Sequence, residues 1–487
     1  MEQVECGCSR RGFLHQLGAG FGTLALEALL REELRAAGVR TQPVIDPLQP
    51  FAPRAPHFPP RAKSVIFLFL VGGPSQVDTF DYKPQLQRLS GQPLPPSLRQ
   101  ALERTKFAHV THGCDDRLLG SPYSWTQYGE SGMWISELFP HLAQHVDELC
   151  FIHSMQAESN NHAPASYQLH TGDVRIGKAS LGSWTTYGLG SENQDLPGYV
   201  VLFDAGPLGG AGNYSNGFLP AAFQPTRLRD QGTPVVDLLP PDEFADGQRA
   251  SLDLIRQLNL QHRQTRQGFT ELDARLASYE LAYRMQSSAL DVGNLEQETQ
   301  HTKRSYGLQH PDERARSFGR KCLLARRLVE KGVRFVQVYD MPDKDGWDAH
   351  SKLEDNHRPR ARWTDQPVAA LLGDLKQRGL LDETLVIWAS EFGRTPLLQG
   401  DGGRNHNAAG FTIWLAGGGV KPGQRIGATD EVGYLAVELP TPFRDLHATI
   451  LAALGLNNDE LSFHANGRQE RLTGVAGSAK IIPGVLA

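Results

Sequence analysis

The sequence predicts an α/β fold, with a mostly parallel, doubly wound sheet flanked by helices, because short apolar runs alternate with helical segments. Continuous apolar runs of this length are typical of strands that are buried on both faces of a parallel sheet. The runs cover residues 63–71, 199–203, 334–338, 384–389 and 411–416. Strands that alternate with helices favour crossover connections, which join parallel strands. The length of 487 residues allows one large domain with insertions, or two domains.

Helical periodicity fills several gaps between these runs. Residues 318–331 and 360–378 each precede a predicted strand, and Gly379 stands where a helix C-cap is expected. Residues 441–454 predict a further helix. A polar stretch near 245–300 is helical in period, so we expect a long helical insertion there.

The predicted layout is one elaborated domain. No clean linker divides residues 61–475, and residues 476–487 are expected to form a C-terminal tail. Residues 89–136 carry turn residues with little periodicity, which predicts a loop-rich excursion.

Composition and charge exclude several classes of protein. The net charge is −5 and the pI about 6.4. No basic stripe favours a nucleic-acid partner, and no polybasic run favours a membrane surface. Five cysteines, two of them close to the N-terminus, leave three at wide spacing, which does not indicate a disulfide framework. Buried free thiols are the favoured interpretation, and a Cys114–Cys150 bridge is the alternative.

The N-terminus predicts a twin-arginine export signal. Ser9 precedes Arg10 and Arg11, and Phe13-Leu14 follows one residue later. The apolar stretch after them is rich in Gly and Ala and too short to span a bilayer stably. We therefore expect a signal region at 1–38, passage through the twin-arginine export machinery, and a periplasmic or extracellular protein. A chance Arg-Arg pair at the start of a helix is the alternative interpretation.

Two further features of the N-terminal region follow from composition. Residues 39–60 are rich in proline and predict an extended linker before the mature fold. No clean Ala-x-Ala motif marks a cleavage site, so the sequence does not fix where the signal would end.

Chemistry-bearing residues follow the ends of three predicted strands, and one more, His406, lies just before the run 411–416. In a parallel sheet, ligands bind beyond the carboxyl ends of the strands, so these side chains are expected to meet at one edge. They are three carboxylates and two histidines: Asp78, Asp348, His350, Glu391 and His406. Such a set predicts one or two divalent metal ions, and the imidazoles favour Zn over the alternatives Mn, Ca and Mg.

Each of these residues also has an ordinary structural interpretation. Asp78 could cap the turn after Gly72-Gly73-Pro74, and His406 could be a loop histidine. Glu391 could form an ion pair with Arg394.

Several motifs together resemble a known family, the domain-of-unknown-function family 1501. They are residues 72–81, 346–350, 391–396 and 402–407, with a tail from 427–431 through 445–450. Members are exported, sulfatase-like bacterial proteins, and the resemblance runs from about Arg10 to Leu472. It implies the alkaline-phosphatase-like superfamily fold, whose members hydrolyse phosphate or sulfate esters with bound metals. By position, the resemblance implies that all five residues of the predicted metal set are ligands.

The sequence departs from sulfatases at the nucleophile. The stretch 162–172 resembles the sulfatase segment with the modified cysteine, but His162 stands in place of that cysteine and Ser166 in place of its arginine. His162 could attack the substrate or bind a metal, and a metal-bound hydroxide could attack instead. Asn161 could donate a hydrogen bond to an oxyanion, and Arg394 could clamp an anionic oxygen.

Three functions are compatible with these residues. The favoured one is an exported metal-dependent hydrolase of sulfate or phosphate esters, acting on an anionic small molecule or a polysaccharide ester. The alternative is a non-catalytic envelope protein that binds an anionic glycan or a partner protein, since the usual nucleophile is missing. A transferase such as a phosphomutase is the weakest, because no strong phospho-acceptor other than His162 is visible.

Overall fold

The computed structural model describes residues 43, 45–46, 49–108, 113–204, 206, 208–236, 238–241, 247–265, 270–340 and 345–487. Contacts divide the chain into Met1–Val44 and Ile45–Ala487, and the second unit holds nearly all the described residues. The twin-arginine motif and the predicted signal region at 1–38 lie outside the described residues. Both stay predictions.

A mostly parallel sheet forms the centre of the second unit, with its strands in the order β12-β4-β11-β8-β1-β7-β5-β6 and with β15 beside β4. Parallel pairing joins β1 to β7 and β8, β5 to β6 and β7, and β4 to β12 and β15. Only β11 runs antiparallel to its neighbours β4 and β8 within the described sheet. The strands are β1 (Ser64–Leu70), β4 (Leu149–Gln156), β5 (Tyr199–Leu202), β6 (Thr226–Leu228), β7 (Phe335–Asp340), β8 (Thr384–Ala389), β11 (Phe411–Ala416), β12 (Gln424–Ile426) and β15 (Thr441–Pro442). The predicted fold class is confirmed.

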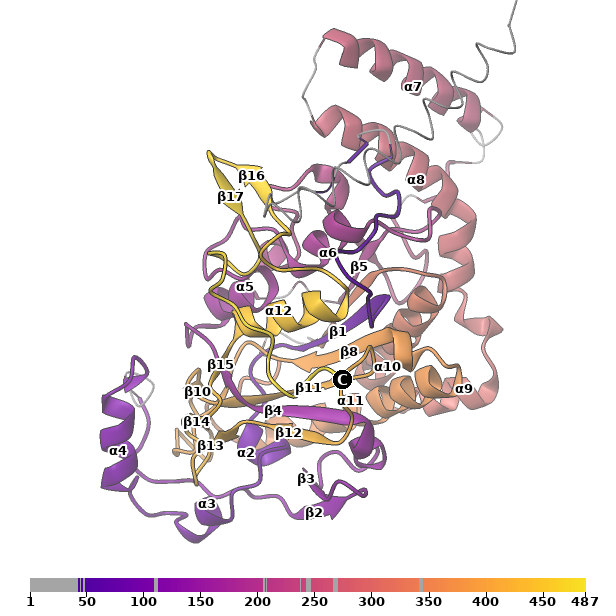
Figure 1. Cartoon of the computed structure of the whole chain (residues 1–487). Helices are drawn as coiled ribbons and strands as arrows, with labels where there is room; N and C mark the ends of the chain where they lie inside the picture. Colours follow the sequence, from indigo (N-terminus) through magenta and orange to yellow (C-terminus); the bar gives the residue numbers. More distant parts are fainter. Residues whose placement is uncertain are drawn as a thin grey trace, which may run out of the picture. The chain divides into compact units, whose positions relative to one another are not determined.

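Helices cover both faces of this sheet. Alternate residues of β1 enter two separate cores: Phe67 and Phe69 pack on one face, and Ile66 and Leu68 on the other. The first face carries α5 (His162–Thr171), α6 (Leu181–Leu189) and α12 (Phe443–Ala453); the second carries α8 (Thr270–Gly293), α10 (Glu313–Glu330) and α11 (Leu353–Gln377). Figure 1 shows α12 running along the sheet near β1. Two covered faces explain why β1 is apolar at nearly every position.

The predicted elements agree closely with the structure in the sheet and less closely in the helices. The runs 384–389 and 411–416 coincide with β8 and β11, and 63–71 exceeds β1 by one residue at each end. Helix α11 begins at Leu353, earlier than the predicted start, and contains Pro359 and Pro367. Its buried face packs against the second core, which offsets the hydrogen bonds that the two prolines remove.

The polar insertion near 245–300 forms α7 (Gln248–Thr265) and α8, which pack against each other. The excursion at 89–136 contains α4 (Pro96–Glu103) and a hairpin of β2 (Trp125–Tyr128) and β3 (Met133–Ser136). In the described part of the chain, no helix combines the length and the apolar composition that a bilayer crossing requires.

The predicted C-terminal tail belongs to the folded unit. Val485 is fully buried, and its carbonyl accepts a hydrogen bond of 2.8 Å from the Lys421 amide. The Ala487 amide donates to the Gly419 carbonyl at 2.9 Å. A boundary at residue 475 therefore does not separate this tail from the core.

The cysteines of the second unit are free thiols. Cys150 and Cys322 are buried, and Cys114 is half-buried. The favoured interpretation of free thiols is confirmed, and the alternative Cys114–Cys150 bridge is wrong.

Candidate metal centre

Five segments of the chain meet at the carboxyl edge of the sheet. The loops after β1, β7 and β8 start there because these strands are parallel neighbours. Strand β11 runs the other way, so the segment that precedes it, with β9 (Gly393–Arg394) paired to β10 (His406–Asn407), reaches the same edge. Strand β4 ends at this edge too, and α5 begins shortly after it. The topology thus brings His162, Asp348, Glu391 and His406 together.

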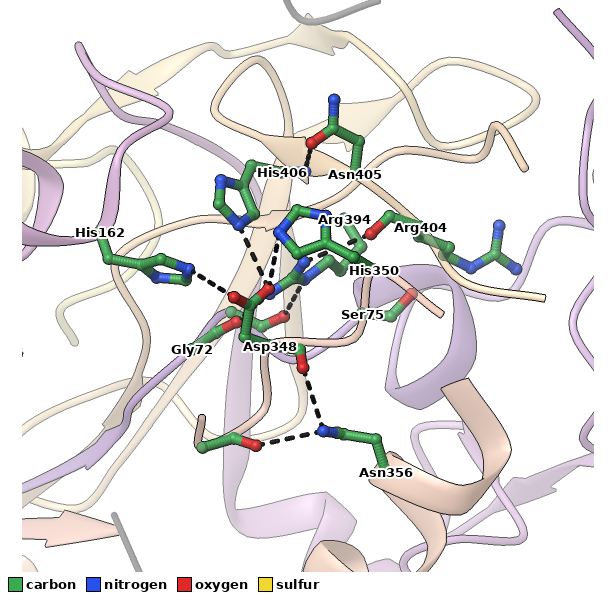
Figure 2. A network of polar contacts seen from close by, with 12 residues as sticks. Gly72, Ser75, His162, Asp348, His350, Asn356, Arg394, Arg404, Asn405 and His406 are labelled. Carbon is green, nitrogen blue, oxygen red and sulfur yellow. Dashed lines mark hydrogen bonds and ion pairs between the residues drawn. The ribbon is translucent and has the colours of Figure 1, made fainter. Parts of the chain in front are cut away.

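Asp348 lies at the centre of this group (Figure 2). Its Oδ2 is 3.2 Å from His162 Nε2, and its Oδ1 is 3.1 Å from His350 Nε2 and 3.3 Å from His406 Nε2. Arg394 Nη2 contacts Oδ1 at 2.6 Å. One carboxylate therefore faces three imidazole nitrogens and a guanidinium.

The other ring nitrogen of each histidine contacts an oxygen. The three contacts are His162 Nδ1 to Glu391 Oε1 at 2.5 Å, His350 Nδ1 to Gln399 Oε1 at 2.5 Å, and His406 Nδ1 to the Asn160 carbonyl at 2.7 Å. Carboxylate and carbonyl oxygens only accept hydrogen bonds, so each Nδ1 carries a hydrogen. The Gln399 amide is oriented by its own Nε2, which donates to the Gly113 carbonyl at 3.2 Å.

These tautomers leave a lone pair on each Nε2 of a neutral imidazole, and all three lone pairs face Asp348. A lone pair next to a carboxylate oxygen is repulsive unless a cation or a proton lies between them. One ligand atom each of His162, Asp348 and His406 lies within 4.8 Å of the other two, and His162 Nε2 is buried without a well-aligned hydrogen-bond partner. Metal-binding histidines nearly always donate their second N–H to an oxygen in this way. The donor set therefore fits a divalent cation.

Charge and burial set the pKa values of these groups in opposite directions. Burial lowers the pKa of His162, but the neighbouring carboxylates of Asp348 and Glu391 outweigh burial and raise the pKa to about 9. Burial lowers the pKa of His406 to about 4, although Asp348 opposes this shift. For Asp348, burial raises the pKa, but the three histidine rings and the Arg394 charge outweigh burial and hold the pKa well below the usual value. The centre thus attracts positive charge. When no cation is bound there, His162 takes up a second proton.

Glu391, predicted as a metal ligand, lies behind His162 in the structure. It is fully buried and contacts His162 Nδ1, while the Gly72 amide donates to its Oε1 at 3.0 Å and Ser390 Oγ donates to its Oε2 at 2.7 Å. Burial raises the pKa of Glu391, but the hydrogen bond from His162 outweighs burial and lowers it. In this position Glu391 fixes the tautomer and the orientation of the His162 ring.

Arg394 holds Asp348 and is itself fully buried, with 0% exposure. Its guanidinium also donates to the carbonyls of Gly72, Gly73 and Arg404. Its ion-pair partner is Asp348, and not Glu391 as in the alternative interpretation of the sequence. With these contacts, the guanidinium holds the Asp348 side chain in place.

Asp78, also predicted as a metal ligand, is paired with Arg404. Arg404 Nε lies 2.7 Å from Asp78 Oδ2, Nη2 lies 3.2 Å from Oδ1, and both side chains have 0% exposure. Ser75 Oγ donates to Asp78 Oδ2 at 2.5 Å. Burial raises the pKa of Asp78, but the Arg404 charge outweighs burial and lowers it. Asp78 is not in the group of three that can share one ion.

The residues at the start of α5 lie at the solvent side of the centre. Asn161 is the N-cap, is exposed, and makes no capping hydrogen bond with its side chain. His350, with 43% of its side chain exposed, is the most accessible of the three histidines. Ser166 is fully buried within α5, away from solvent.

Several supporting residues could not be assigned from the sequence. Asn356, in the first turn of α11, donates through Nδ2 to the carbonyls of Gly346 at 3.2 Å and Asp348 at 3.1 Å. The Arg404 amide donates to the Ala349 carbonyl at 3.0 Å. Arg404 stood inside a motif that the sequence singled out, whereas nothing near Asn356 indicated its contacts.

The fold and site define a class: a mostly parallel α/β protein with a candidate metal centre at the carboxyl edge of its sheet. The family model described as "Protein of unknown function (DUF1501)" matches residues 62–486. The chain belongs to this family, as the sequence motifs predicted. A search of curated proteins found no match.

Several solved structures are similar to the chain at low sequence identity. Lipoteichoic acid synthase LtaP from Listeria monocytogenes is 9% identical, with 90% of this chain and 80% of that one covered and a TM-score of 0.36. Alkaline phosphatase from the Antarctic bacterium TAB5 is 11% identical, with 81% of this chain and 98% of that one covered and a TM-score of 0.35. PsFucS1 sulfatase from Pseudoalteromonas sp. is 14% identical, with 83% of this chain and 68% of that one covered and a TM-score of 0.32. Scores this low establish no shared activity.

Proposed function

We propose that the protein is an exported, metal-dependent hydrolase of sulfate or phosphate esters. The observation that carries the proposal is the arrangement around Asp348, where three imidazole Nε2 atoms face one carboxylate and each Nδ1 is fixed by its own oxygen acceptor. Outer hydrogen bonds of this kind are typical of histidines that bind metals.

His162, Asp348 and His406 would hold the ion, with His350 at the exposed side. Two or three nitrogen donors with one carboxylate favour Zn, with Mn, Ca and Mg as alternatives. When bound, a divalent ion supplies Lewis-acid stabilisation of negative charge on an ester oxygen.

The chain's own residues would orient the substrate and keep the ligands in place. The N-terminus of α5 carries partial positive charge and is suited to an anionic ester oxygen. Asn161, exposed at this N-terminus, is placed to donate a hydrogen bond to such an oxygen. Arg394 holds Asp348 in place, and Glu391 holds His162. These contacts would spare the ligands any rearrangement during the reaction.

Metal analysis and turnover test the proposal together. The purified protein is assayed for bound metals and for hydrolysis of an aryl sulfate and an aryl phosphate, alongside His406→Ala and a matched His464→Ala control. His464 is exposed on β16 (Phe463–Ala465), outside the centre, so its removal should change neither metal content nor turnover. We expect His406→Ala to lose both. A wild-type protein that holds no metal and hydrolyses neither ester would refute the proposal.

A binding protein without turnover is the second candidate. In its favour, Ser166 is fully buried and Arg394 is occupied by Asp348 and backbone carbonyls, so neither faces a substrate. On this hypothesis, the metal-loaded protein binds a sulfated or phosphorylated glycan, measured by calorimetry, and releases no product. Product formation that His162→Ala abolishes would exclude it.

Export by the twin-arginine route is part of the proposal and rests on the sequence around Arg10 and Arg11. Replacing both arginines by lysine keeps the charge but removes the motif. We expect the variant to stay in the cytoplasmic fraction, whereas the wild type reaches the periplasm or the medium. Equal distribution of the two proteins would contradict the export prediction.

A further inference from the structure

Asp78 and Arg404 form a fully buried ion pair next to the metal centre. Two guanidinium nitrogens contact the two carboxylate oxygens, at 2.7 and 3.2 Å, and neither side chain is exposed. Ser75 Oγ adds a third hydrogen bond to the carboxylate, at 2.5 Å. A carboxylate satisfied in this way has its charge neutralised and its oxygens occupied.

The pair is joined to the centre through the backbone of the same segment. The Arg404 carbonyl accepts from Arg394 Nη1 at 3.3 Å, and Arg394 holds Asp348. The Arg404 amide donates to the Ala349 carbonyl, next to Asp348. His406 follows Arg404 by two residues (Figure 2). The contact between Arg404 and Asp78 therefore also fixes the segment that carries this histidine.

Formal charge decides how many cations the centre can take. Asp78, Asp348 and Glu391 contribute three negative charges, and Arg394 and Arg404 contribute two positive ones. One divalent ion would change the remaining charge of −1 to +1, which suits an anionic ester. A second ion would raise it to +3 in a buried site, with no carboxylate of this group left to neutralise it.

We propose that the centre takes a single divalent ion, and that the Arg404 guanidinium on Asp78 serves as the fixed second cation of the site. This inference rests on the proposed function and narrows the one or two ions that the sequence predicts to one. The arginine is always charged and, unlike a metal ion, does not have to be taken up from solution. The site would therefore be complete with one equivalent of metal.

Counting bound ions tests the inference independently of activity. The full chain is stripped with a chelator, dialysed and titrated with Zn, and the ions per chain are counted by native mass spectrometry and elemental analysis. Asp348→Asn shows whether the counted ion sits at this centre, since this variant should bind none. The double variant Asp78→Asn/Arg404→Gln replaces the ion pair by two neutral amides and should still bind one ion.

Each result has a defined meaning. One ion per wild-type chain, lost in Asp348→Asn, supports the inference. Two ions per wild-type chain overturn it while leaving the proposed function intact, and no ion overturns the proposed function itself. A folded double variant that binds no ion would show that the ion depends on Asp78 or Arg404 and would also overturn the inference; circular dichroism establishes that the variant is folded.

Discussion

Replacing Glu391 by glutamine is the sharpest perturbation of the candidate centre, because it changes one charge and almost no volume. Glu391 is fully buried and contacts His162 Nδ1 at 2.5 Å. The amide can still accept from this N–H, but it cannot make the His162 ring as basic as a carboxylate does. Changes at such supporting residues cost about 10- to 100-fold in metal affinity. We therefore expect Zn to bind Glu391→Gln about 1.4–2.7 kcal/mol more weakly.

Two measurements detect this difference in Zn affinity between Glu391→Gln and the wild type. Calorimetry with a competing chelator gives the Zn affinity directly. Thermal unfolding gives it a second time: at a Zn concentration of about 100 times the wild-type Kd, bound metal stabilises the wild type by about 2.7 kcal/mol. A variant with 100-fold weaker binding keeps only about 0.4 kcal/mol of that stabilisation.

A matched control separates this effect from the loss of any buried carboxylate. Asp365 is buried in α11 and accepts hydrogen bonds from the amides of His141 at 2.9 Å and Leu142 at 2.8 Å, outside the centre. Asp365→Asn should leave Zn affinity unchanged. If Glu391→Gln also binds Zn as the wild type does, Glu391 does not position His162 and the reasoning fails.

Three further outcomes follow from the structure. Asp348→Asn removes the shared carboxylate, and calorimetry should show Zn affinity reduced by more than about 100-fold, beyond the range for supporting residues. Burial lowers the pKa of both His170 and His447 to about 4 from 6.5. The unfolded chain therefore takes up protons first, and the free energy of unfolding should fall as pH drops from about 6.5 to 4, by up to about 3 kcal/mol per histidine; urea unfolding at pH 7.5 and 5 measures this. Gly172→Ala should destabilise by more than about 1 kcal/mol in the same assay, since φ is +78° and a Cβ would collide with the Leu472 carbonyl.

The sheet was predictable where an apolar run is nearly continuous and not where two adjacent polar residues interrupt it. Strands β8 and β11 have no charged residue, and their boundaries were predicted correctly. Strand β4 escaped prediction because His153 and Ser154 interrupt its apolar run. Both are satisfied inside the fold, His153 by Thr412 at 3.0 Å and Ser154 by the Leu439 carbonyl at 2.7 Å. Tertiary partners that lie far away in the sequence thus decide whether a polar residue can sit in a buried strand.

The direction of β11 was equally hidden, although its position in the sequence was clear. An apolar run looks the same in a parallel and an antiparallel strand when both faces are covered. The reversal matters for the site, because it brings the segment before β11 to the edge where the other strands end. His406 reaches the centre for this reason.

The site shows which part of a metal set a sequence can predict. Asp348, His350 and His406 were expected to meet, and they do. Strand ends fix where Asp348 and His350 lie, whereas His406 reaches the same edge through the reversed strand β11. The roles of Asp78 and Glu391 were not predictable, since both are buried carboxylates near the same edge.

These two carboxylates differ in the side chain that each one contacts. The Arg404 guanidinium contacts both oxygens of Asp78. Glu391 instead contacts Nδ1 of the His162 ring and makes the other ring nitrogen, Nε2, more basic. Arg404 and Asp78 lie more than three hundred positions apart in the sequence, so only the fold determines that they pair. On the single-ion proposal, Arg404 therefore sets the number of metal ions, whereas His406 helps to set their place.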